Sequence, residues 1–260
     1  MSREPLILMT PPERLRRARE LNAEIAHRAY RLGQGPHLYR AGTPVSGGLM
    51  AVNDREFDGR GDGGALCGEI LRECTARGFH GAVLNFEQGC KPVLERVIPE
   101  LEEGFTRRKW TLYVPEEYAH CTQYARVMVS SALSGGSLHS RLEEGLERWG
   151  KKRLTLVLER VREDFFLPAP DGQGEKLDRK QLEELMGEWN PSVFFSHELC
   201  ARYFTYMSRE NGAHFVLFDD GDTIRKKIQV ARGLGITAFM AALEDVEDIA
   251  EKIELVQEAR

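Results

Sequence analysis

The sequence lacks the cysteine and histidine patterns that stabilise small domains or bind metals. Its five cysteines are an odd number and form no C-x-x-C pair, so neither a disulfide framework nor a zinc knuckle is indicated. The seven histidines are scattered without an H-x-x-x-H pattern, and we therefore expect no metal site and no cofactor. Reduced thiols fit a reducing compartment best.

Long hydrophobic runs and a strong basic excess are also missing. The apolar segment Leu6–Met9 is too short for the core of a signal peptide or for a membrane span, so we expect a cytoplasmic protein with no membrane partner. The net charge is −5, whereas phosphate-backbone binding needs a concentrated basic face. The basic clusters at 14–19 and 107–109 are short, so nucleic acid is not an expected partner.

Glycine-rich phosphate turns do not occur either. The sequence contains neither G-x-G-x-x-G nor G-x-x-x-x-G-K, and Thr10-Pro11-Pro12 follows the first expected strand instead. This absence argues against an open doubly wound sheet, which usually carries such a turn after its first strand. No low-complexity or proline-rich linker divides the chain.

Short apolar runs alternate along the chain with amphipathic helical stretches, which is typical of a parallel sheet covered by helices. About eight such units in 260 residues predict one α/β domain, a (β/α)8 barrel over residues 1–260. A small α+β insertion is expected at about 164–219, before the last strand. Strands are predicted at 6–10, 37–41, 48–52, 81–87, 110–114, 126–132, 153–159 and 236–243, and helices at 12–32, 64–77, 92–105, 139–150, from Asp222 to Gly233, and 246–256.

The segment Gly78–Glu87 carries the most chemical information. In a strand, residues two apart share a face, so Val83, Asn85 and Glu87 point one way and the apolar residues between them point the other. Glu87 would lie at the carboxyl end of its strand, where barrel active sites are built, as a candidate general acid. The alternative is a strand-end carboxylate paired with a neighbouring charge.

This segment resembles the fourth-strand signature of the family 18 glycoside hydrolases, the chitinase-like enzymes, which reads Asp-Gly-x-Asp-x-Asp-x-Glu. The resemblance implies that Glu87 is the general acid/base and that Asn85 stands where an Asp assists the substrate acetamido group in substrate-assisted hydrolysis. Val83 and His80 stand at the two earlier Asp positions. An Asn cannot supply the negative charge, so the catalytic apparatus is predicted to be degenerate.

The C-terminal third resembles the same family in layout. The family has an insertion hairpin, a Tyr/Phe-Asp-Asp turn, an Ile-x-x-Lys helix and a glycine turn before its eighth strand. The matching segments here are 203–206, 212–220, 224–227 and 233–235. The eighth strand of the family ends in a Trp beneath the sugar, whereas here it ends at Ala242 and Leu243. On the sixth strand, Ser130 and Ser131 stand where the family has a Tyr and an Asp that contact the substrate.

Two further residues are candidates for the barrel mouth. Glu159 follows a strongly apolar strand and could reach the mouth, or belong to a solvated loop with internal ion pairs, and Tyr113 could line the mouth or belong to the core. Three functions remain open: a glycosidase on N-acetylglucosamine-containing glycans such as peptidoglycan or chitin, a non-catalytic barrel that binds a glycan or a protein partner, and a scaffold with a filled cleft. If the protein is an enzyme, Glu87 is its acid; we favour a degenerate relative.

Overall fold

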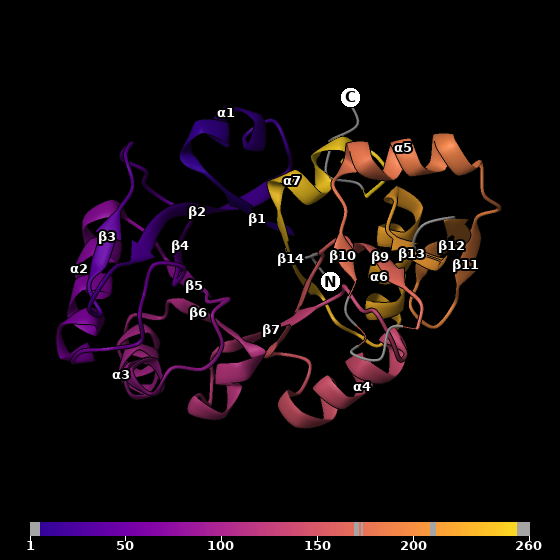
Figure 1. Ribbon diagram of the computed structural model, residues 1–260. Helices are drawn as coiled ribbons and strands as arrows, with labels where there is room; N and C mark the ends of the chain where they lie inside the picture. Colours follow the sequence, from indigo (N-terminus) through magenta and orange to yellow (C-terminus); the bar gives the residue numbers. More distant parts are fainter. Residues whose placement is uncertain (1–5, 169–171, 173, 209–211, 254–260) are drawn as a thin grey trace, which may run out of the picture.

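The computed structural model describes residues 6–168, 172, 174–208 and 212–253, which contain a closed barrel of eight parallel strands (Figure 1). The barrel strands are β1 (Leu6–Thr10), β2 (Ala23–Leu32), β4 (Leu49–Asn53), β5 (Gly81–Asn85), β6 (Thr111–Pro115), β7 (Arg126–Ser130), β8 (Leu154–Val157) and β14 (Ala238–Ala242). Strand β1 pairs in parallel with both β14 and β2, and these pairings close the sheet. The predicted barrel is confirmed, and the open-sheet alternative is wrong. The strand predicted at 37–41 forms as β3 (Leu38–Arg40), but it pairs antiparallel with β2 and is not a barrel strand, so that prediction is wrong about its place.

Helices follow most of the barrel strands and cover the outer face of the sheet (Figure 1). Outside the insertion they are η1 (Pro12–Arg14), α1 (Leu15–Ala18), η2 (Gly63–Ala65), α2 (Leu66–Arg77), α3 (Pro92–Arg108), η3 (Glu116–Cys121), α4 (Leu138–Trp149), α6 (Gly221–Gly233), α7 (Leu243–Val246) and η4 (Glu247–Ile249). As predicted, α2 ends at Gly78, which has a left-handed φ of 67°. No helix within the described ranges is both long and apolar enough to cross a membrane.

The alternation along β5 sorts side chains between the barrel interior and the helices. Val83 belongs to a buried cluster inside the barrel with residues from the other barrel strands, including Met9, Tyr113 and Met128. Its neighbours Ala82 and Leu84 belong to the larger core that packs beneath the helices. The faces that the sequence predicts for this strand are therefore confirmed, and they direct the end of β5 toward the barrel mouth.

The helix predicted at 12–32 is wrong beyond its first turns. Only η1 and α1 form there, and residues 23–32 are the long strand β2. The register of β2 against β4 shifts between His27 and Tyr30, so Ala26 faces the barrel interior while Ala29 and Tyr30 both join the outer core. This irregularity produces apolar spacings of three and four residues, which look helical in the sequence.

An antiparallel sheet lies between β8 and α6. Its strands are β9 (Arg162–Phe166), β10 (Glu175–Lys176), β11 (Phe194–Ser196), β12 (Ala201–Ser208) and β13 (Gly212–Phe218), in the order β10-β9-β13-β12-β11. Helix α5 (Arg179–Trp189) packs Leu182 against Phe204, Val216 and Phe218 of this sheet. Figure 1 shows the insertion on the side of the barrel away from α2 and α3.

A buried ion pair joins this insertion to the barrel. Lys227 of α6 and Asp219 are both fully buried at the side chain, with Nζ 2.6 Å from Oδ2. Asp219 also accepts hydrogen bonds from the Thr223 hydroxyl at 2.7 Å and from the Val161 backbone N–H at 2.9 Å. Every donor around this carboxylate therefore comes from α6 or from the segment that enters the insertion.

The beginning and end of the C-terminal region differ from the predictions. The residue that caps α6 is Asp220, whose side chain accepts the backbone N–H groups of Asp222 and Thr223, and not Asp222 as predicted. The final helix predicted at 246–256 is replaced by the short helices α7 and η4. Its last residues, 254–256, lie outside the described residues.

Lys227→Met should destabilise the protein by about 3–5 kcal/mol, because the change leaves Asp219 as a buried charge without its countercharge. Urea unfolding of the variant and wild type measures this difference. The matched control is Lys226→Met on the exposed face of the same helix, which should change the free energy of unfolding by no more than about 0.5 kcal/mol. Equal unfolding midpoints for the two variants would contradict this role of the ion pair.

Candidate active site

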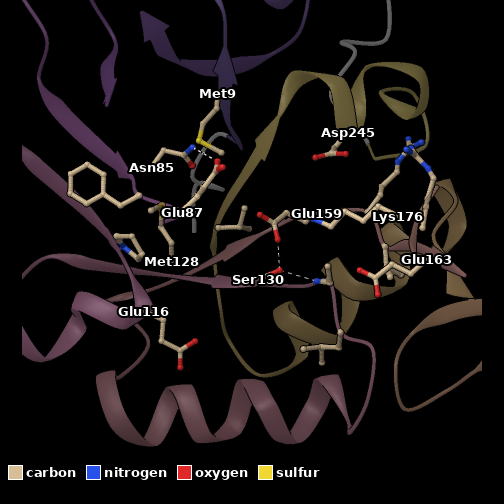
Figure 2. Close-up of a pocket in the computed structure, with 18 of the residues that line it drawn as sticks. Met9, Asn85, Glu87, Glu116, Met128, Ser130, Glu159, Glu163, Lys176 and Asp245 are labelled. Atoms are coloured by element: carbon tan, nitrogen blue, oxygen red, sulfur yellow. Dashed lines mark hydrogen bonds between the residues drawn. The ribbon is translucent and has the colours of Figure 1, made fainter. Parts of the chain in front are cut away.

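A cleft of about 910 Å³ opens at the carboxyl ends of the barrel strands and extends along the insertion (Figure 2). Barrel residues contribute Met9, Asn85, Met128, Ser130 and Val157, and the insertion contributes Glu163, Lys176 and Leu177. In Figure 2, Asn85 and Glu87 lie on one side, Asp245, Lys176 and Glu163 on the other, and Ser130 and Glu159 between them. The lining is mostly polar, and among the described residues Phe86 is the one aromatic residue that contributes to it.

Glu87 lies two residues beyond the end of β5, and donors surround its carboxylate. The Asn85 amide donates to Oε1 at 2.8 Å, and the Arg55 guanidinium donates to Oε2 from Nε at 3.2 Å and from Nη2 at 3.1 Å. The Glu87 side chain is 45% exposed, so the group is accessible from the cleft. Asn85 on β5 and Arg55 just after β4 thus hold the Glu87 carboxylate in place as hydrogen-bond donors.

Asp54 fixes the backbone beneath Glu87. This fully buried residue follows β4, and its carboxylate accepts the backbone N–H of Glu87 at 2.8 Å and that of Gln88 at 3.4 Å. The Lys91 ammonium lies 3.3 Å from the same carboxylate. Neither Asp54 nor Arg55 is predicted as a site residue from the sequence. Their only sequence signal is that they follow a strand end, as Glu87 does.

Ser130 and Ser131 both contact Glu159, but from different positions. The Ser130 hydroxyl donates to the Glu159 carboxylate and lines the cleft (Figure 2). Ser131 is fully buried, where its hydroxyl donates to the Glu159 carbonyl and accepts the Glu159 N–H, each at 3.2 Å. Glu159 lines the cleft, and these hydrogen bonds hold its backbone and its carboxylate against the end of β7.

Asp245 is a further carboxyl group in the cleft, and it is not among the residues predicted from the sequence. Burial raises the pKa of Asp245 to about 6, and the nearby charges of Glu159 and Glu244 raise it further than Arg160 and Arg162 lower it. A carboxyl group with this pKa can hold a proton near neutral pH, as a general acid must. It follows the last barrel strand without a recognisable motif, so only the folded structure brings it beside Glu159.

The remaining candidates do not line the cleft. Val83 and Tyr113 are buried inside the barrel at 0% and 5% exposure, below the mouth. Ala242 ends β14 and is partly buried. The structure therefore brings together Asn85, Glu87, Ser130 and Glu159, while the other four candidates lie beneath or beside them.

Solved structures resemble this barrel, although no protein-family model and no curated protein matches the sequence. The spore cortex-lytic enzyme SleL of Bacillus megaterium has a TM-score of 0.70 at 13% identity, over 99% of this chain and 75% of that chain. A chitinase from Chromobacterium violaceum has a TM-score of 0.70 at 14% identity, over 98% and 100%. A family 18 chitinase from Cycas revoluta has a TM-score of 0.62 at 12% identity, over 96% and 98%.

The chain shares the fold of the chitinase-like family 18 barrels. The predicted resemblance is confirmed at the level of fold, and at these identities fold does not carry activity with it.

Asp245→Asn should change how stability depends on pH. The folded pKa of about 6 lies above the ordinary 3.8, so the folded protein retains this proton longer than the unfolded chain does. The contribution of Asp245 to wild-type stability should therefore be lost as pH rises from about 4 to 7, and the variant should gain stability relative to wild type over that window.

Thermal unfolding at several pH values gives the difference between the two proteins. Glu251→Gln, an exposed change in the same region, is the control and should give a difference that stays constant with pH. A constant difference for Asp245→Asn as well would mean that this carboxyl group is not perturbed.

Proposed function

We propose that the cleft binds an N-acetylglucosamine-containing glycan, such as a chitin or peptidoglycan strand, and that the catalytic apparatus of this family 18-like barrel is degenerate. The observation that carries the proposal is Glu87. It stands at the carboxyl end of the fourth barrel strand beside a cleft of about 910 Å³. That volume is in the range of small-molecule and oligosaccharide sites.

The cleft chemistry supports a polar, hydroxyl-rich ligand. Carboxylates of Glu87, Glu159 and Glu163 and the cations of Arg162 and Lys176 line the space, and each can exchange hydrogen bonds with sugar hydroxyl or acetamido groups. Among proteins of this fold, a tobacco class V chitinase was solved with NAG4 and the Cycas revoluta chitinase with (GlcNAc)3. Their ligands suggest the class of glycan to test here.

Three features support weak or absent hydrolysis. Asn85 offers a neutral amide where the family signature has a carboxylate, and here that amide donates to Glu87. Arg55 donates hydrogen bonds to the Glu87 carboxylate, so this carboxylate must separate from Arg55 before Glu87 can protonate a leaving group. Ser130 is occupied with Glu159, and its short side chain does not replace a Tyr or Asp.

The alternatives receive different support. The open volume of the cleft disfavours a scaffold whose cleft is filled. A protein partner is the second candidate, because the lining has few aromatic rings on which sugars could stack.

Isothermal titration with chitotetraose tests the binding proposal, with cellotetraose, which lacks acetamido groups, as the control ligand. We expect binding of chitotetraose alone. Glu159→Ala should weaken it roughly tenfold, since a charged acceptor contributes on the order of 1.5 kcal/mol. Glu143→Ala, an exposed change on α4, is the matched control and should bind like wild type. Failure of wild type to bind, or equal affinity for both ligands, would refute the glycan proposal.

Hydrolysis of the same oligomers tests the catalytic proposal. Asn85→Asp should raise turnover by at least about tenfold, because it restores negative charge beside the reacting acetamido group. Glu87→Gln should remove whatever turnover remains in wild type and in Asn85→Asp. If Glu87→Gln turns over substrate as fast as its parent, Glu87 is not the acid, and if Asn85→Asp brings no gain, the defect lies elsewhere in the cleft.

A further inference from the structure

Outside the cleft, three potential metal ligands converge where α3 begins and η3 ends. They are Glu95, His120 and Cys121, whose ligand atoms all lie within 4.8 Å of one another. His120 Nε2 is 3.2 Å from Glu95 Oε1 and 3.3 Å from Cys121 Sγ. Within the described part of the chain, this is the one group of at least three His, Cys or acidic residues with such spacing.

These separations match the coordination sphere of a small tetrahedral cation. Carboxylate, imidazole and thiolate are the ordinary protein ligands of Zn²⁺, with bonds of about 2.0–2.3 Å. At tetrahedral angles those bond lengths separate neighbouring ligand atoms by roughly 3.3–3.8 Å. The separations of 3.2 and 3.3 Å at His120 Nε2 lie at or just below the lower end of this range, and all three ligand atoms lie within 4.8 Å of one another, so small shifts of these side chains would complete the coordination.

The orientation of the His120 ring supports the same site. Its Nδ1 lies 2.9 Å from the Glu117 backbone carbonyl, which can only accept, so Nδ1 carries a hydrogen. The other ring nitrogen, Nε2, is therefore the atom directed toward Glu95 Oε1 and Cys121 Sγ, where a cation between the three groups would lie. A carbonyl that orients the distal nitrogen is also the usual support of a histidine that binds metal.

We propose that Glu95, His120 and Cys121 bind a divalent cation of the Zn²⁺ class. The thiolate makes Mg²⁺ and Ca²⁺ poor occupants, since these ions prefer oxygen ligands. Cys90 is a further thiol close by, since its Sγ donates to the same Glu117 carbonyl at 3.2 Å.

The proposed ion would stabilise the rim of the cleft. Tyr118 of η3 already donates its hydroxyl to the Gly89 carbonyl at 3.0 Å and accepts the Lys91 N–H at 2.9 Å. These bonds tie η3 to the segment 86–91 between β5 and α3, which contains Glu87. Glu116 and Glu117, at the start of η3, line the cleft itself. A cation between η3 and α3 would add a third link to the segment that carries Glu87.

The ligands come from separate elements, so no sequence motif reveals them. His120 and Cys121 are adjacent, and Glu95 lies 25 residues before His120. The patterns that identify zinc sites in a sequence rely on paired ligands at short, regular spacing.

Metal content of the purified full-length protein tests the proposal. The protein is kept reduced, equilibrated with Zn²⁺, dialysed against metal-free buffer and measured by inductively coupled plasma mass spectrometry. We expect close to one Zn²⁺ per chain in wild type, and close to none in Cys121→Ser or His120→Ala. The matched control is His139→Ala, which removes an exposed histidine whose Nδ1 lies 3.0 Å from Glu143 on α4, a His–Glu pair without a thiol; it should retain the ion.

Two measurements keep the result decisive if a variant folds poorly. Co²⁺ added to wild type should give a thiolate charge-transfer band, which reports a cysteine ligand without any substitution. Zn²⁺ should raise the Tm of wild type and His139→Ala but not that of the two site variants. Wild type that binds no Zn²⁺ and shows no Co²⁺–thiolate band would overturn the proposal. Equal Zn²⁺ content in wild type and Cys121→Ser would also overturn it.

Discussion

The contact between Asp219 and Lys227 determines how the C-terminal third of the barrel is assembled. A buried carboxylate and ammonium are tolerated only when their remaining hydrogen-bonding groups also have partners. Besides Lys227, Asp219 accepts hydrogen bonds from the Thr223 hydroxyl and from the Val161 backbone N–H. One side chain thereby fixes α6, the end of β13 and the segment that follows Glu159. Asp54 has the same role on the opposite side of the cleft, where it holds the backbone of Glu87. The two walls thus depend on buried carboxylates that do not face the ligand space.

The sequence predicts the barrel because each strand and helix has its own local pattern. It fails at β2, where the register shift between His27 and Tyr30 gives a strand the apolar spacing of a helix. It also misplaces the cap of α6 by two residues, because Asp219, Asp220 and Asp222 all fit a helix start and only tertiary contacts distinguish them. Local pattern therefore predicts which elements exist better than where they begin and end.

The candidate site is likewise predictable only in part from the sequence. Asn85, Glu87, Ser130 and Glu159 are predictable as cleft residues because they stand at strand ends in a barrel. Val83 and Tyr113 share the inward face but lie lower in the barrel, where packing surrounds them. Arg55, Asp245 and the group at His120 depend on pairs of residues far apart in the chain, and no single segment contains that information. The sequence left two interpretations open for Glu87, a general acid or a carboxylate paired with a neighbouring charge. Arg55 is such a charge, so Glu87 is an acid candidate that also forms an ion pair.

The chain enters and leaves the insertion at nearly one point. Val161 and Asp219, 58 residues apart, are joined by the Asp219 N–H to the Val161 carbonyl at 2.9 Å and by the Val161 N–H to the Asp219 side chain at 2.9 Å. Because the barrel holds these two ends together, the segment between them behaves as a closed loop, and the entropy of closing it grows only logarithmically with its length. Residues can be added, removed or exchanged there without altering the strand register of the barrel. The wall formed by Glu163, Lys176 and Leu177 is therefore the part of the cleft that evolution or design can reshape most freely.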